Sequence, residues 1–154
     1  MRYIHIFSII IFLSSCTQVE DNREQSSIIK NSESDDITFI ISLKVNSNST
    51  EDLNQLVEEI TQNVINTEAF CLEYGYFISD DGTSVTLYEK YEDSDGATMH
   101  GQNFIDGPFF DRFFNLFTLE KFIVTGPASD EFKKFTSENG FVIEYRGSVD
   151  GFIR

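Results

Sequence analysis

The order of apolar patterns along the chain constrains its fold more than any other feature of the sequence. From Ile37 to Val45, apolar and polar residues alternate, which predicts a half-buried strand. A helix is predicted next, because apolar residues then recur at a spacing that places them on one face. These residues are Leu53, Leu56, Val57, Ile60 and Val64. Ser49 or Thr50 is suited to cap the N-terminus of this helix.

Two strands joined by a tight turn are predicted after this helix. The first covers residues 70–78, and the side chains expected on its apolar face are Phe70, Leu72, Tyr74, Tyr76 and Ile78. Asp81-Gly82 follows, and an Asp-Gly pair between two alternating segments is a strong signal for a β-hairpin. Residues 83–91 then return as the second strand of the hairpin.

A second helical region and a fourth strand complete the pattern. A first short helix is expected before Asn103, and Pro108 is suited to begin another. On the helix from Pro108, four aromatic residues recur at i, i+3, i+4 and i+7, namely Phe110, Phe113, Phe114 and Phe117. Residues 119–125 form the fourth predicted strand. The order β-α-β-β-α-β over residues 37–126 is that of a ferredoxin-like α+β fold.

The last part of the chain, residues 127–154, predicts a helix and a strand added to this domain. Ser129 can cap a helix that ends before Gly140, and an extended segment follows from Phe141 to Tyr145.

The helix from Pro108 carries more apolar residues than one contact face needs. Phe109 and Leu116 lie off the phenylalanine stripe and make the helix apolar on a second side. Three arrangements account for such a surface: the C-terminal extension covers it, a second subunit covers it, or it forms the wall of a ligand pocket.

The N-terminus resembles the signal peptide of a bacterial lipoprotein. Ile6 to Leu13 is apolar apart from one serine, which is too short to span a bilayer but suits the apolar part of a signal peptide. It ends in Leu13-Ser14-Ser15-Cys16, which resembles a lipobox. The resemblance implies that residues 1–15 are removed and that Cys16 is acylated. The alternative is an ordinary cleaved signal peptide in which this cysteine has no role.

Acylation of Cys16 would anchor the protein to a membrane of the bacterial cell envelope through lipid. Residues 16–36 are rich in Ser, Asn, Glu and Asp, which predicts a solvated tether. Thr17 stands where a lipoprotein retained in the inner membrane usually has Asp, so the outer membrane is favoured over the inner one. Cys71 would then have no disulfide partner within the chain, and we expect it to be a buried strand residue.

The charge of the chain excludes one class of partner. Its 154 residues include 11 Lys and Arg against 26 Asp and Glu, so the formal net charge is −15. A chain this acidic lacks the basic surface that nucleic acids require, and no nucleic-acid partner is predicted. No metal site is predicted either, because Cys and His are scarce and the acidic turns lack the spacing of a calcium loop.

A series of short motifs resembles the antibiotic biosynthesis monooxygenase-like family. It consists of Phe77-Ile78-Ser79-Asp80-Asp81-Gly82, then Leu87-Tyr88-Glu89-Lys90-Tyr91-Glu92-Asp93-Ser94, then Ala97 and His100. The resemblance covers about residues 37–125. It implies a homodimer in which two sheets pack face to face as a dimeric α/β barrel, with a pocket in each subunit between sheet and helices.

The resemblance also implies a choice of chemistries. Some members oxidise quinols or aromatic polyketides with oxygen and no bound cofactor, and others degrade haem. This chain has no Trp and no Asn in residues 37–45, and His100 would be the sole candidate haem ligand. Haem degradation is therefore not predicted, and the predicted function is cofactor-independent monooxygenation of a small phenol or quinol. The alternative, which the missing Trp and Asn favour, is a non-catalytic module that binds a small molecule or assembles as a dimer.

Two residues are predicted to carry the catalysis. His100 is the only imidazole once His5 leaves with the signal peptide, and its ordinary pKa near 6.5 suits it to take a phenolic proton. The alternative is an exposed helix residue. Glu89 shares a strand face with Val85 and Leu87, and a carboxylate there needs a partner because burying it alone is costly. It is expected either to orient His100 or to form a structural pair.

The remaining candidates would bind a small aromatic ligand. Strand tyrosines combine an aromatic surface with a hydroxyl that can orient a ligand, and as an alternative they are half-buried packing residues. Asn103 is a candidate hydrogen-bond donor to an anion derived from dioxygen, and Phe113 is a candidate wall residue. The tyrosines are Tyr74, Tyr76, Tyr88 and Tyr91.

Overall fold

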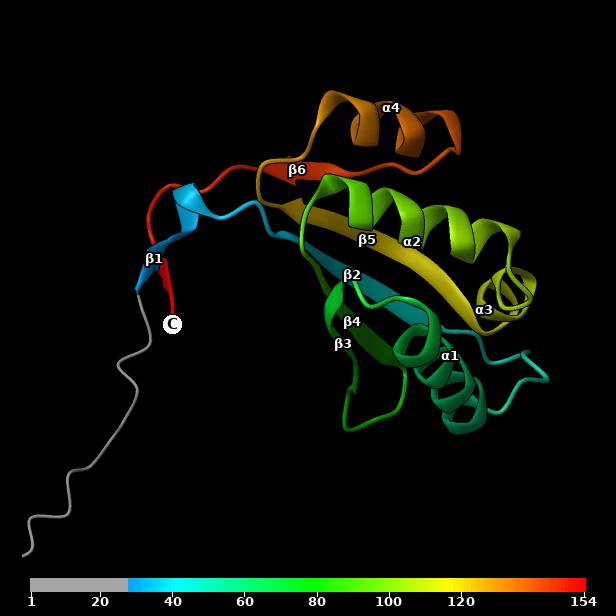
Figure 1. The fold of residues 1–154 in the computed structure, drawn as a ribbon. Coiled ribbons are helices and arrows are strands. Elements are labelled where there is room, and N and C mark those ends of the chain that lie inside the picture. The colour runs from blue at the N-terminus through cyan, green and yellow to red at the C-terminus, as the bar shows by residue number, and fades with distance from the viewer. Residues whose placement is uncertain (1–27) are drawn as a thin grey trace, which may run out of the picture.

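The computed structural model describes residues 28–154, and the predicted signal peptide and Cys16 lie outside them. A five-stranded sheet with helices on one side forms the body of the protein (Figure 1). Its strands are β2 (Ile37–Val45), β3 (Cys71–Ile78), β4 (Ser84–Tyr91), β5 (Phe117–Thr125) and β6 (Glu144–Arg146). The helices are α1 (Leu53–Thr67), α2 (Ser94–Asp106), α3 (Phe110–Leu116) and α4 (Asp130–Glu138).

The topology confirms the predicted ferredoxin-like α+β fold. The strand order is β3-β4-β2-β5-β6, and the first four strands pair antiparallel. Both helical crossovers therefore skip one strand, as the split βαβ arrangement requires. The C-terminal extension adds a third crossover, because α4 returns the chain to β6 in parallel pairing with β5.

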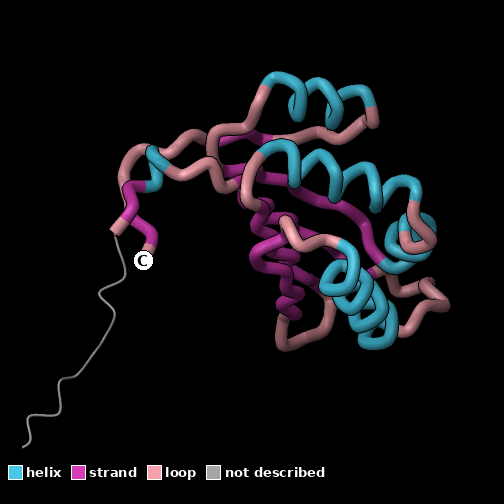
Figure 2. Tube along the Cα trace, viewed as in Figure 1, coloured by secondary structure: helices cyan, strands magenta, loops and turns pink. Residues whose placement is uncertain are grey.

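One core lies between the sheet and the helices, which Figure 2 shows as cyan coils beside the magenta strands. Alternate residues of β2 are buried, as its sequence pattern predicts. The apolar face of α1 completes this side of the core through Leu56, Ile60 and Val64. Within residues 28–154, no helix covers the opposite face of the sheet.

Three details of the predicted elements are wrong. The N-cap of α1 is Asp52, whose carboxylate accepts a hydrogen bond from the Gln55 N–H, and neither Ser49 nor Thr50 caps it. Phe117 begins β5 and does not belong to the preceding helix. The last strand of the sheet covers Glu144–Arg146, later than predicted, whereas Ser129 caps α4 as expected.

The apolar face predicted for residues 70–78 holds only in part. The pairing of β3 with β4 shifts between Cys71 and Glu73, and this bulge turns Leu72 away from the core and leaves it 48% exposed. Tyr74 and Tyr76 pack against the core. Ile78 is exposed at the end of an edge strand.

A small ribbon joins the two ends of the described chain. At the end of the segment predicted as a tether, β1 (Ile29–Lys30) pairs antiparallel with β7 (Phe152–Ile153), and the 3-10 turn η1 (Asn31–Glu33) leads from β1 towards the sheet. Figure 1 shows this ribbon at one end of the sheet, away from the helices. Within residues 28–154, no helix is both long enough and apolar enough to cross a membrane.

Candidate functional site

An apolar cavity of about 60 Å³ lies between the sheet and helices α2, α3 and α4. This volume holds about five water molecules. Tyr74, Glu89, His100 and Thr136 are the polar side chains on its wall. The other side chains that line it are Phe39, Ile41, Leu87, Ala97, Phe104, Phe113, Phe114, Leu119, Phe122, Phe132, Phe135 and Phe141.

The Phe-rich helix α3 and the C-terminal extension meet at this cavity. Phe113 and Phe114 supply part of its wall, and Phe132 and Phe135 of α4 close it from another side. The surplus side of the helix, Phe109 and Leu116, does not line this cavity: Leu116 is 2% exposed, and Phe109 is half-buried against the core of the same subunit.

His100 stands between two carboxylates. Its Nδ1 lies 2.7 Å from Oε2 of Glu68, the residue that ends α1, and its Nε2 lies 3.7 Å from Oε2 of Glu89 on β4. The imidazole is 7% exposed and belongs to α2, so it is not an exposed helix residue. Among the described residues, every fully buried side-chain nitrogen or oxygen has a hydrogen-bond partner. Because Nε2 has no such partner, it is not fully buried, and His100 is one of the residues that line the cavity.

Glu89 has the partners that its burial requires. Its side chain points from β4 towards the core, where it is 2% exposed. The Tyr91 hydroxyl donates to its Oε2 over 2.7 Å. Glu68 is likewise held from two sides, because the Asn103 side-chain amide donates to its Oε1 over 3.1 Å. We call Glu68, Glu89, Tyr91 and His100 the buried polar cluster, and Asn103, which is exposed, binds it from the surface.

The protonation equilibria of the cluster are coupled. Burial opposes a charge on His100, but the carboxylates of Glu89 and Glu68 outweigh it and raise the pKa of the imidazole. Burial also opposes a charge on Glu68, yet the hydrogen bond from His100 lowers the pKa of that carboxyl. For Glu89, the effect of burial is larger than the opposing effects of His100 and the Tyr91 hydroxyl, and the pKa of this carboxyl is raised. The geometry thus favours an imidazolium bound to the Glu68 carboxylate.

Tyr74 adds a hydroxyl to the polar end of the cavity. The centroid of its ring lies 5.9 Å from the centroid of the His100 imidazole. Its hydroxyl oxygen lies 3.1 Å from the hydroxyl oxygen of Tyr76. Burial raises the pKa of Tyr74 well above its ordinary value, so it stays a neutral phenol.

The structure brings most of the predicted site residues together. His100, Glu89, Tyr74 and Phe113 line the cavity. Tyr91 and Tyr76 lie behind this wall and form hydrogen bonds to Glu89 and Tyr74. Asn103 is exposed, does not line the cavity, and donates a hydrogen bond to Glu68. Tyr88 is not brought to the cavity, because successive strand residues point to opposite faces and Tyr88 lines a separate polar cavity with Lys90.

Glu68 was not recognised from the sequence. It lies 32 residues from His100, and no periodic pattern includes it. The signal that could have indicated it is electrostatic. A carboxylate at the C-terminal end of a helix lies at the negative end of the helix dipole, where an acidic residue is disfavoured unless a specific partner compensates.

Cys71 is not suited to nucleophilic chemistry. Burial, together with the nearby carboxylates of Glu89 and Glu68, raises the pKa of its thiol to about 12. Residues 28–154 also contain no group of three or more His, Cys, Asp or Glu side chains able to hold a metal ion.

Comparison with known proteins supports the fold. No known family model matches the chain, and no curated protein matches it significantly. MupZ from Pseudomonas fluorescens shares 20% identity over 77% of this chain and 94% of its own, with a TM-score of 0.64. The chain therefore shares the fold of MupZ.

Two further solved structures align less well. One is a variant of SnoaB, a cofactor-independent oxygenase from Streptomyces nogalater, with 14% identity over 62% of this chain and 96% of its own and a TM-score of 0.45. The other is a proposed antibiotic biosynthesis monooxygenase from Caulobacter crescentus, with 18% identity over 70% of this chain and 77% of its own and a TM-score of 0.40.

Proposed function

We propose that the protein binds a small phenol or quinol in the apolar cavity and oxidises it with molecular oxygen, without a cofactor. The observation that carries this proposal is the position of His100 and Glu89 at the polar end of a cavity otherwise walled by aromatic and aliphatic side chains. An apolar pocket with a few convergent polar groups and shifted pKa values is typical of a binding or active site.

The first step removes a proton from the bound hydroxyl. The sequence assigned this role to His100 and an orienting role to Glu89. In the structure, the imidazole is oriented by the hydrogen bond that its Nδ1–H donates to the Glu68 carboxylate. The raised pKa of His100 means that the imidazole holds its proton more firmly than a free histidine does, whereas the raised pKa of Glu89 makes this carboxylate a stronger base. Glu89 therefore takes the proton, and the imidazolium stabilises the phenolate.

The second step is the reaction with oxygen. An electron-rich phenolate can transfer an electron to dioxygen, and the substrate supplies all four electrons that the reduction of O₂ needs. For a phenol with a free para position, the sum is phenol plus O₂ giving quinone plus H₂O. For a quinol with a free ring position, it is quinol plus O₂ giving hydroxyquinone plus H₂O, so in both cases one oxygen atom enters the product and the other leaves as water. The aromatic cavity keeps bulk water away from the radical pair.

A non-catalytic binding module is the second candidate. It is favoured by the hydrogen bonds within the buried polar cluster, since each of its carboxylates already has a protein partner, as in a structural network. In that case the cavity holds its ligand and no oxygen is consumed.

Oxygen consumption separates the two candidates. We expect the purified full-length chain in detergent to consume oxygen with phenol or hydroquinone, unaffected by metal chelators, and ¹⁸O from labelled gas to enter the benzoquinone formed from phenol. Tyr88→Phe serves as the control, since Tyr88 lies outside the cavity. Ligand binding without oxygen uptake would reject the enzyme and leave the binding module.

We also propose a homodimer anchored in the cell envelope through lipid on Cys16. The helix-free sheet face supports the dimer, because Ile40 and Ile123 lie on it half-buried and Phe77 stands 63% exposed at its edge. The lipobox-like sequence supports the anchor. Native mass spectrometry should give a dimer mass, and labelled palmitate should be incorporated into the wild type and not into Cys16→Ser. A monomer mass would contradict the proposed dimer. Labelling of Cys16→Ser would contradict the proposed anchor.

A further inference from the structure

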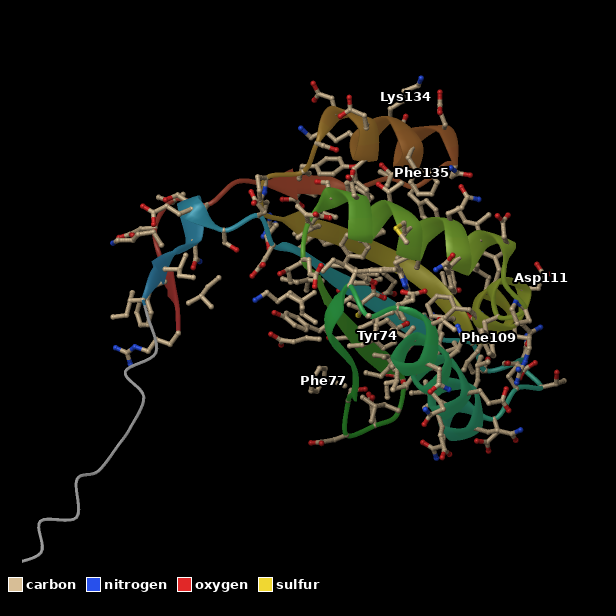
Figure 3. All side chains as sticks on the ribbon, in the orientation of Figure 1. Tyr74, Phe77, Phe109, Asp111, Lys134 and Phe135 are labelled. Carbon is tan, nitrogen blue, oxygen red and sulfur yellow. The ribbon has the colours of Figure 1, made fainter. Side chains whose placement is uncertain are left out.

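The C-terminal extension supplies one wall of the cavity. Phe132 and Thr136 of α4 line it and are almost fully buried, whereas Phe135 between them is half-buried and borders both the cavity and the surface. In Figure 3, Phe135 lies between α4 and α2, and the neighbouring Lys134 points away from the body of the protein.

Phe135 occupies space that a missing side chain leaves free. A Cβ atom added to Gly101 would lie 2.7 Å from Cε1 and 3.2 Å from Cζ of the Phe135 ring, so the tip of the ring rests on the bare backbone of α2. Gly101 directly follows His100. Any ligand whose hydroxyl reaches His100 therefore shares the cavity with this ring.

The helix that carries Phe135 is held independently of the ring. Phe132 is 1% exposed, and the Thr136 and Tyr145 hydroxyls are 2.7 Å apart, which ties α4 to β6. β6 in turn pairs with β5. A change in the side-chain rotamer of Phe135 thus alters the free length of the cavity without displacing α4.

We propose that Phe135 is a specificity-determining residue that sets the largest aromatic ligand the cavity accepts. With the ring resting on Gly101, the cavity admits one-ring compounds in preference to fused two-ring compounds. This inference rests on the proposed function for the class of ligand, a small aromatic compound, and not for the reaction.

The test compares the affinity of the full-length chain for phenol and 1-naphthol, and for benzene and naphthalene, which have no hydroxyl to react. We expect Phe135→Ala to raise the affinity for the two-ring compound relative to the one-ring compound by about tenfold or more, since even one methylene in an apolar pocket is worth that much. Phe135→Leu should give a smaller change in the same direction. Gly101→Ala should push the ring into the cavity and weaken binding of both ring sizes.

Lys134→Ala is the matched control, because it removes a neighbouring side chain that does not line the cavity. It should leave the affinity ratio unchanged. An unchanged ratio in both Phe135 variants, with thermal denaturation showing folded protein, would overturn the inference. If no aromatic compound binds any variant, both this inference and the proposed ligand class are rejected. If the ratio shifts as expected but no variant consumes oxygen, Phe135 keeps its role and only the proposed reaction fails.

Discussion

His100→Gln should lower oxygen uptake by a factor of about 10² to 10³, the usual contribution of a positioned group that stabilises negative charge on the reacting substrate. It should also destabilise the folded protein by about 3–5 kcal/mol at pH 7, because removing one partner of a buried ion pair leaves the other charge uncompensated. Here Glu68 and Glu89 would both lose the imidazolium that stands between them. Urea denaturation followed by circular dichroism measures the second effect.

The pH dependence of this variant separates charge loss from simple loss of packing. Without the imidazolium, the two carboxylates of Glu68 and Glu89 bind protons more readily, so the destabilisation should be smaller at pH 5 than at pH 7. It should shrink again as the pH rises through the folded-state pKa of His100, because the wild type then loses its imidazolium too. A loss of packing would be the same at both pH values. Glu120→Gln on the exposed side of β5 is the control and should leave stability within about 0.5 kcal/mol of the wild type. A pH-independent loss in His100→Gln would contradict the proposed charge pairing.

The sequence predicted those parts of the fold that depend on local periodicity. The bounds of β2 agree with its alternation from Ile37 to Val45, and the burial of Glu89 follows from its place among apolar residues on β4. Local patterns cannot show where the strand pairing slips. The bulge beside Leu72 depends on how β3 pairs with β4, and so the exposure of Leu72 was missed.

Of the candidate site, the sequence likewise predicted only the residues that stand out without knowledge of the packing. His100 and Glu89 could be named because each is conspicuous by itself, one as the only histidine of the domain and the other as an acid on an apolar strand. Glu68 becomes significant only when the end of α1 meets α2 in space. The contribution of Phe135 likewise needs the packing of α4 over Gly101, which no spacing within either helix reveals.

Glu68→Gln should move the pH dependence of stability to lower pH. In the folded protein the pKa of His100 is raised above its ordinary value of about 6.5, so the stability that its charge contributes is complete below that value. This stability is lost as the pH rises through the folded-state pKa. Glu68 is itself stabilised as a carboxylate, and its contribution is lost as the pH falls through its lowered pKa.

The variant keeps a hydrogen-bond acceptor for Nδ1 but removes a negative charge from beside the ring. The pKa of His100 should therefore fall, and each unit of the fall corresponds to about 1.4 kcal/mol less stabilisation of the imidazolium. The other titratable groups of the site do not produce this change, because Tyr74 and Tyr91 have pKa values well above 10 and Cys71 titrates near 12.

Nuclear magnetic resonance of the imidazole protons measures the pKa of His100 directly, and the spectrum of His100→Gln distinguishes its signal from that of His5.

The alkaline limb of the pH profile of oxygen uptake should move with the pKa of His100, because activity needs the imidazolium that stabilises the phenolate. Its acid limb should stay tied to the carboxylate of Glu89, which must be ionised to take the proton. If the pKa of His100 and both limbs were unchanged in Glu68→Gln, the contact between Glu68 and His100 would serve packing alone. A shifted pKa with unaltered oxygen uptake would place the charge pair outside the reaction.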